Sequence, residues 1–293
     1  MLPVDLVKLR TLMEYTSGSP DMKIGVIDGP VVVEHPDLAE GRVRQIPGSN
    51  GAACAQARSL ACRHGTFVTG ILAAKRTSAA PAICPGCTIL VRPILAEMHS
   101  GRERVPSGTP TDLAAALGDC VDAGARVVNL SLALAGTVTS GGQALTEALN
   151  YAARRGVLVV AAAGHATLGS SLITGHAWVI PVVGCDIAGH PLRGSTLGDS
   201  IGRQGLRAPG DRVTSLGTEG QSLTLGGTSV AAPFVTGAIA LLWSTFPAAT
   251  ASQIKMAITS PSPSRRASVV PPLLDAAAAH QQLLNTTVRQ WTT

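Results

Sequence analysis

Three residues that lie far apart in the sequence carry the side-chain types that together make an alcohol nucleophilic: Asp28, His64 and Ser229. A serine hydroxyl is a weak nucleophile until a base removes its proton, and imidazole has a pKa suited to that role near neutral pH. A carboxylate can hold the imidazole in the required tautomer and stabilise its charged form. An acid, an imidazole and a hydroxyl are therefore the parts of a relay for nucleophilic catalysis.

Each of these residues stands at the end of a predicted element. Asp28 closes the strand-like run KIGVID and is followed by Gly-Pro, and His64 stands before Gly-Thr at the predicted start of a helix. Ser229 follows GGT and opens a long apolar helix, whose N-terminus favours developing negative charge. Each motif alone is better explained by a turn or a helix cap than by catalysis. All three in the order Asp, His, Ser favour catalysis.

Strand and helix patterns alternate along the chain. The predicted strands cover residues 23–28, 88–95, 127–134, 157–164 and 178–185, and the predicted helices cover 64–75, 111–125 and 141–156. This alternation predicts an α/β fold with a doubly wound, mostly parallel sheet and helices on both faces. In such a sheet, chemistry occurs beyond the carboxyl ends of the strands, where the three candidate residues are expected.

The chain of 293 residues is long enough for one large domain with a substantial core. We expect this domain to cover residues 1–259. The polar stretch SPSPSRRAS then begins a second segment, 260–293, which consists of a linker and an Ala-rich C-terminal helix. We expect this helix to pack on the same domain.

The composition argues against several classes of partner. The net charge is only +5, and the arginines are scattered without interleaved aromatic residues, so no nucleic-acid partner is expected. The first twenty residues lack an apolar run suited to a secretory signal, and no segment of membrane-spanning length is free of Gly, Pro and charge. These observations predict a cytoplasmic protein without a membrane partner.

Four of the six cysteines form two closely spaced pairs, Cys54 with Cys62 and Cys84 with Cys87. They are interpreted either as two local disulfides or as free thiols. A redox dithiol is disfavoured because CPGC precedes a strand instead of opening a helix, and a zinc site lacks a second ligand pair at suitable spacing. No acidic cluster has calcium-like spacing. We expect no metal site and no cofactor.

Four segments resemble the successive signature segments of subtilisin-like serine peptidases: VIDGPVVVEHPDL, HGTFVTGILAA, VVNLSLAL and GGTSVAAPFVTGAIALLW. The resemblance covers about residues 21–259. It implies the three-layer subtilisin-like fold, with Asp28, His64 and Ser229 as the catalytic triad. Further stretches, including the Asp-Gly-Pro that replaces the usual Asp-Thr-Gly, resemble the cyanobactin-type maturation proteases, which cut the leader from ribosomally made precursor peptides.

One departure from the family pattern concerns the oxyanion hole. The family segment AAAGN ends in an asparagine whose amide completes the hole beside the nucleophile's backbone N–H, whereas this sequence has AAAGHAT with His165 at that position. Loss of one such donor costs about 10²–10³-fold in kcat. Either His165 donates in its place, or another group or water does, or the enzyme is slow. We expect a functional but slower enzyme.

By the same resemblance, two segments form the walls of the substrate cleft and pair with an extended peptide. The residues of these walls are Ser131, Leu132 and Ala133 on one side and Ala161, Ala162, Ala163 and Gly164 on the other. The alternative is that these residues only pack within the sheet. For the stretch VVNL we prefer this alternative, with Asn129 satisfying backbone groups.

The resulting prediction is a serine endopeptidase that removes the leader from a ribosomally synthesised precursor peptide through an acyl-enzyme. Its expected partner is that precursor peptide. Two other functions remain open from the sequence: a general degradative subtilase, and a catalytically impaired homologue that acts as a peptide-binding scaffold.

Overall fold

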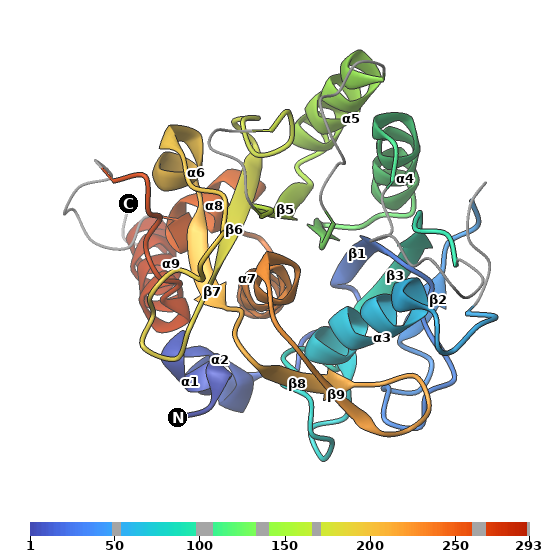
Figure 1. Cartoon of the computed structure of the whole chain (residues 1–293). Coiled ribbons are helices and arrows are strands. Elements are labelled where there is room, and N and C mark those ends of the chain that lie inside the picture. Colours follow the sequence, from blue (N-terminus) through green and yellow to red (C-terminus); the bar gives the residue numbers. More distant parts are fainter. Residues whose placement is uncertain (49–53, 98–107, 133–140, 166–170, 260–267, 292–293) are drawn as a thin grey trace.

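The computed structural model describes residues 1–48, 54–97, 108–132, 141–165, 171–259 and 268–291, and it has an α/β fold around a seven-stranded sheet (Figure 1). The strand order is β2-β3-β1-β4-β5-β6-β7, and all neighbouring strands are parallel. The strands are β1 (Lys23–Asp28), β2 (Val43–Gln45), β3 (Thr88–Pro93), β4 (Val127–Leu130), β5 (Leu158–Ala162), β6 (Val179–Cys185) and β7 (Leu206–Pro209). A separate antiparallel hairpin consists of β8 (Val213–Leu216) and β9 (Ser222–Leu225).

Helices cover both faces of the sheet, which confirms the predicted fold class. The helices are α1 (Pro3–Leu6), α2 (Leu9–Tyr15), α3 (Leu60–Ala73), α4 (Pro110–Asp122), α5 (Gly142–Arg154), α6 (Asp199–Gln204), α7 (Thr228–Thr245), α8 (Ala251–Thr259) and α9 (Ala276–Trp291). Helices α3 and α7 pack on one face, and α4 and α5 pack on the other (Figure 1).

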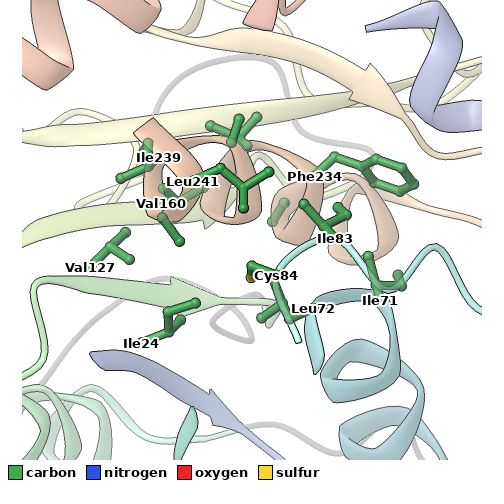
Figure 2. Close-up of a cluster of buried hydrophobic side chains, with 14 of the residues drawn as sticks. Ile24, Ile71, Leu72, Ile83, Cys84, Val127, Val160, Phe234, Ile239 and Leu241 are labelled. Carbon is green, nitrogen blue, oxygen red and sulfur yellow. The ribbon is translucent and has the colours of Figure 1, made fainter. Parts of the chain in front are cut away.

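The side chains of the buried strands alternate between two cores. In β1, Ile24 and Val26 join the core beneath α3 and α7, whereas Ile27 joins the core beneath α4 and α5. Figure 2 shows part of the first core, in which Ile24 on β1, Leu72 on α3 and Ile239 on α7 lie around one apolar space. Successive side chains of a strand point to opposite faces of the sheet, and here both faces are buried. Most positions are therefore apolar, and the strands read as continuous apolar runs.

Helix α7 is apolar on all sides because it lies in the centre of the first core. Its length and composition would allow it to cross a membrane, but 83 % of it is buried inside the fold. A core helix of this kind meets the same criteria as a membrane span. Its first residues emerge at the edge of the sheet, where Ser229 lies.

The C-terminal helix α9 packs against α2 and α8, and it buries Ala276, Ala279 and Leu283 in the first core. The carboxylate of Asp275 accepts a hydrogen bond from the N–H of Ala278, which caps the start of the helix. The predicted boundary lies between residues 259 and 260. Residues 260–267, which follow it directly, lie outside the described part of the chain.

Candidate active site

Asp28 is the last residue of β1, and its side chain is completely buried at the carboxyl edge of the sheet. Its Oδ1 accepts a hydrogen bond of 2.6 Å from the N–H of Gly29. Its Oδ2 has no hydrogen-bond partner among the described residues. A buried carboxylate with so few donors is stabilised chiefly by a nearby cation or strong donor, and His64 occupies that position.

His64 is the fifth residue of α3, one turn inside the helix. The prediction that the helix starts at this residue was wrong, because Ser59 caps the helix earlier by accepting a hydrogen bond from the N–H of Cys62. The Nδ1 of His64 lies 2.7 Å from Oδ1 of Asp28, and its Nε2 lies 3.0 Å from Oγ of Ser229. Since a carboxylate only accepts, Nδ1–H donates to Asp28, and Nε2 is left to accept from the serine hydroxyl.

The close approach of α3 to the end of β1 depends on a glycine pair. A β-carbon on Gly65 would lie 2.4 Å from the carbonyl oxygen of Gly29, and one on Gly29 would lie 2.1 Å from that of Ala61. Neither distance is compatible with a side chain. The Gly-Pro after Asp28 and the Gly-Thr after His64 therefore allow the carboxylate and the imidazole to meet.

The electrostatics of His64 follow from two opposing effects. Burial lowers its pKa, whereas the charge of Asp28 and the hydrogen bond to it raise the pKa, and the net direction is upward from 6.5. The imidazole is thereby a stronger base than in water, and its protonated form is stabilised by the carboxylate. The arrangement can remove a proton from Ser229 and hold it.

Ser229 is the second residue of α7, so its N–H belongs to the first turn, where helical N–H groups have no partner inside the helix. Pro233 lies four residues later, in the second turn, and it has no N–H to donate to the carbonyl of Ser229. The hydroxyl of Ser131 donates to this carbonyl instead, at 2.8 Å. The side chain of Ser131 is thus directed to the nucleophile's backbone.

A buried polar network holds Ser131 in this position. The amide of Asn129 donates to Oγ of Ser131 at 2.7 Å, and the hydroxyl of Thr236 on α7 donates to Oδ1 of Asn129 at 2.9 Å. The prediction that Asn129 satisfies backbone groups was wrong, since its side-chain partners are two hydroxyls. Pro233 at four residues after Ser229 is the sequence signal that could have revealed the need for an outside donor.

His165 follows β5 and lies beside the nucleophile. Its Nε2 lies 3.2 Å from the place that a β-carbon on Gly227 would occupy, and Oγ of Ser229 lies 3.7 Å from the same place. Gly227 has φ +134°, and with no side chain it leaves this space open. His165 is exposed, and its backbone forms an antiparallel bridge with Ser195. The imidazole and the serine hydroxyl therefore border one small space.

The predicted cleft walls differ in how much backbone they leave free. Ala161 lies within β5, paired with Leu130 on one side and Pro181 on the other, so it offers no free strand edge. Ala162 is paired with Val182. Only residues beyond the strand ends can pair with a peptide. The residues just beyond these ends are Ser131 and Leu132 after β4 and Ala163 and Gly164 after β5, and the N–H of Ala163 already donates to the carbonyl of Val182 at 2.9 Å.

All the described residues of the two walls are buried, and Ala133 lies outside the described residues. The N–H of Gly164 already donates to the hydroxyl of Thr228, and its carbonyl accepts from Thr196. Gly164 therefore positions the start of α7 as well as bordering the cleft.

Cys54 and Cys62 form a disulfide that ties the preceding loop to the first turn of α3. With Glu97 they also form a cluster with metal-ligating atoms, but disulfide sulfurs are not thiolates and Glu97 accepts hydrogen bonds from Ala55, Gln56 and Ser59. Disulfides persist mainly in oxidising compartments. The disulfide therefore does not support the predicted cytoplasmic location, which stays a prediction.

For the second cysteine pair the structure agrees with the interpretation as free thiols and not with a local disulfide, because Cys84 and Cys87 are not joined to each other and are buried in the first core. The CPGC segment, residues 84–87, forms a turn that is closed by a 3.0 Å hydrogen bond from the N–H of Cys87 to the carbonyl of Cys84. A hydrogen bond with Cys87 and burial raise the pKa of the Cys84 thiol, which keeps it unreactive.

Comparisons with known proteins agree with this geometry. The model of the subtilase family matches residues 19–281. The protease domain of PatA, the patellamide maturation protease, aligns with a TM-score of 0.81 and 27 % identity over 92 % of this chain and 97 % of that chain. The prenylagaramide maturation protease PagA aligns with a TM-score of 0.79 and 26 % identity over 94 % and 98 %.

A thermophilic serine proteinase of Bacillus sp. (strain AK1) is 35 % identical over 234 residues. These residues are 78 % of this chain and 54 % of that protein, so the chain spans about half the length of this relative.

Proposed function

Because the chain belongs to the subtilase family and is a subtilisin-like serine peptidase, we propose that it removes the leader from a ribosomally synthesised precursor peptide. The observation that carries the proposal is the continuous line from Asp28 through His64 to Ser229, with contacts of 2.7 and 3.0 Å. Such a line is the minimal arrangement for forming an acyl-enzyme on serine.

In the proposed mechanism, Nε2 of His64 takes the proton of Ser229 as Oγ attacks the scissile carbonyl carbon. The imidazolium is stabilised by Asp28, and it then gives its proton to the leaving amine as the peptide bond breaks. Water, activated by the same imidazole, releases the acyl group. The raised pKa of His64 favours the first proton transfer.

Two donors are proposed for the oxyanion. The first is the N–H of Ser229 at the start of α7, where the helix dipole also favours negative charge. The second is the imidazole of His165, which borders the open space above Gly227. His165 takes the position of the family asparagine, and we expect it to act less efficiently because an imidazole presents only one N–H from this ring edge.

The substrate class is supported by the likeness to PatA and PagA, two maturation proteases that each align with more than nine-tenths of this chain. A precursor peptide would bind in an extended form, pairing with the backbone that follows β4 and β5. The precursor peptide is then the protein's partner as well as its substrate.

The test combines active-site labelling with a cleavage assay. A fluorophosphonate probe should label the native protein and fail to label Ser229→Ala. Mass spectrometry of a leader-bearing precursor should show one cut between leader and core, while a panel of unrelated folded and unfolded proteins stays intact. Broad digestion of the panel would indicate a degradative subtilase instead. No labelling of well-folded protein would indicate a peptide-binding scaffold.

A further inference from the structure

A pocket of ≈ 250 Å³ lies between the start of α3 and the turn that joins β8 to β9. Its wall includes Arg58 and Arg63 from the α3 side and Thr218, Glu219 and Gln221 from the turn, with Leu223 of β9 as an apolar floor. Arg63 is the residue directly before His64, so the pocket adjoins the catalytic helix.

The turn is fastened to the segment before α3 at several points. The N–H of Gly217 donates to the carbonyl of Gln221 at 2.8 Å, which closes the turn. The hydroxyl of Thr218 donates to the carbonyl of Ala57 at 2.6 Å. Arg58 and Glu219 form an ion pair of 3.2 Å across the pocket mouth. The pocket is therefore defined by contacts between both of its walls.

The charges that line this pocket do not balance. Glu219 is the carboxylate in its lining, and it is paired with Arg58. Arg63 is half-buried and has no carboxylate partner in the part of the chain that the structure describes. A guanidinium that loses water without gaining a partner is costly, and a carboxylate matches its fork of N–H donors. The lining thus has one arginine available for an anionic group.

We propose that this pocket binds an acidic side chain, Asp or Glu, of the peptide substrate, with Arg63 as its ion-pair partner. The proposal rests on the proposed peptidase function, since it assigns a specificity site for the same peptide substrate. The amide of Gln221 and the hydroxyl of Ser222 line the same space and can donate to the carboxylate.

The position of the pocket indicates which part of the peptide it would contact. Strand β9 leads directly into the segment that carries Ser229, and Arg63 directly precedes His64 on α3, so the pocket is built from the two segments that also carry the base and the nucleophile. The α3 and β8–β9 elements lie on the opposite side of α7 from β5 (Figure 1). The acidic residue would therefore lie near the scissile bond, on the side away from the wall of Ala163 and Gly164.

The experiment uses a set of quenched fluorogenic peptides of one cleavable sequence, in which each position on either side of the cut carries Glu, Gln or Lys in turn. The native protein should cut the Glu peptide about fivefold faster, in kcat/KM, than the Gln peptide at one position near the cut, the size expected for one partly exposed ion pair. The preference should weaken as salt is added.

Arg63→Glu should reverse the preference at that position, so that the Lys peptide becomes the better substrate. Arg154→Glu makes the same charge change on the exposed surface of α5, remote from the pocket, and should leave the preference as it is. If Arg63→Glu does not fold, Arg63→Gln should make the Glu and Gln peptides equal. Equal rates for Glu and Gln at every position in the native protein would overturn the proposal, as would Arg63→Glu with an unchanged Glu preference.

Binding of the same peptides to Ser229→Ala, followed by fluorescence anisotropy, separates this proposal from the proposed function. Tighter binding of the Glu peptide that is lost in Ser229→Ala with Arg63→Glu would support the pocket even if the native protein cuts nothing. Cleavage without any acidic preference, together with equal binding, would leave the peptidase function intact and reject the pocket.

Discussion

The hydroxyl of Ser131, just beyond β4, donates a 2.8 Å hydrogen bond to the carbonyl oxygen of Ser229 in the first turn of α7. Pro233 removes the N–H that would normally serve that carbonyl. The central sheet thereby fixes the backbone of the nucleophile directly. Ser131, predicted as part of a cleft wall, has its hydroxyl bonded to the backbone of the nucleophile and to the amide of Asn129.

Ser131→Ala should therefore impair both stability and catalysis. It removes the hydroxyl partner of the partly buried carbonyl of Ser229 and of the buried amide of Asn129, which should lower the free energy of unfolding by about 1–3 kcal/mol. A displaced Oγ should lower kcat by on the order of 10- to 100-fold with little change in KM. Ser131→Thr, which keeps the hydroxyl, is the control. A variant with unaltered kcat would show that the contact does not position the nucleophile.

Asp28→Asn should leave the fold intact and reduce kcat by about 10⁴-fold. The amide is nearly isosteric with the carboxylate, but it cannot stabilise the imidazolium and it permits the wrong tautomer of His64. The measurement is turnover of a fluorogenic peptide together with the rate of fluorophosphonate labelling. Loss of both, with an unchanged circular dichroism spectrum and melting temperature, is the expected result. Labelling at the native rate would contradict the role of Asp28.

The pH dependence should follow His64, whose pKa is raised because the charge and hydrogen bond of Asp28 outweigh the opposing effect of burial. Only the neutral imidazole is a base, so kcat/KM should fall with a slope of one as pH drops through this raised pKa. Folding stability should depend on pH in the opposite direction to kcat/KM. The His64–Asp28 pair contributes stability fully below pH about 6.5 and loses it as pH rises through the raised value. In Asp28→Asn the acid limb should move to lower pH, and an unmoved limb would assign it to another group.

The disulfide between Cys54 and Cys62 should contribute about 2–3 kcal/mol to the free energy of unfolding, as expected for closing a short loop. The double variant Cys54→Ser with Cys62→Ser should unfold at lower denaturant concentration than the oxidised protein. Reduced native protein should behave like the variant, which makes it the matched control. Identical unfolding curves for oxidised, reduced and variant protein would show that the disulfide is not formed in solution.

The long elements and the relay could be predicted from the sequence because local patterns specify them. Apolar runs such as KIGVID and the glycine-flanked Asp28, His64 and Ser229 carry their own signals. The strands β2 and β7 and the β8–β9 hairpin were not predicted, because they are three or four residues long and have no strong periodicity. The observed helix α3 also begins earlier than predicted, because Ser59 caps it and Leu60, Ala61 and Cys62 form its first turn.

Contacts between distant segments could not be predicted. The orientation of Ser131 depends on the approach of β4 to α7, and the Arg63 pocket depends on a turn 150 or more residues away in the chain, as in the contact between Ala57 and Thr218 with a separation of 161. Composition showed only that arginines are scattered. Which arginines form ion pairs, and that Arg63 has no carboxylate partner among the described residues, are properties of the folded chain.

A β-carbon on Gly227 would lie 3.2 Å from Nε2 of His165 and 3.7 Å from Oγ of Ser229, and we propose that the oxyanion binds in this space. His165→Ala should therefore lower kcat by about 10²–10³-fold while KM changes little. Its side chain is exposed, so the melting temperature should hold. His165→Asn is the matched variant, and it should retain or exceed the native kcat because an amide N–H is always available to donate. Steady-state kinetics of the three proteins decide the role. A native rate in His165→Ala would mean that the N–H of Ser229, with water or another group, suffices for the oxyanion.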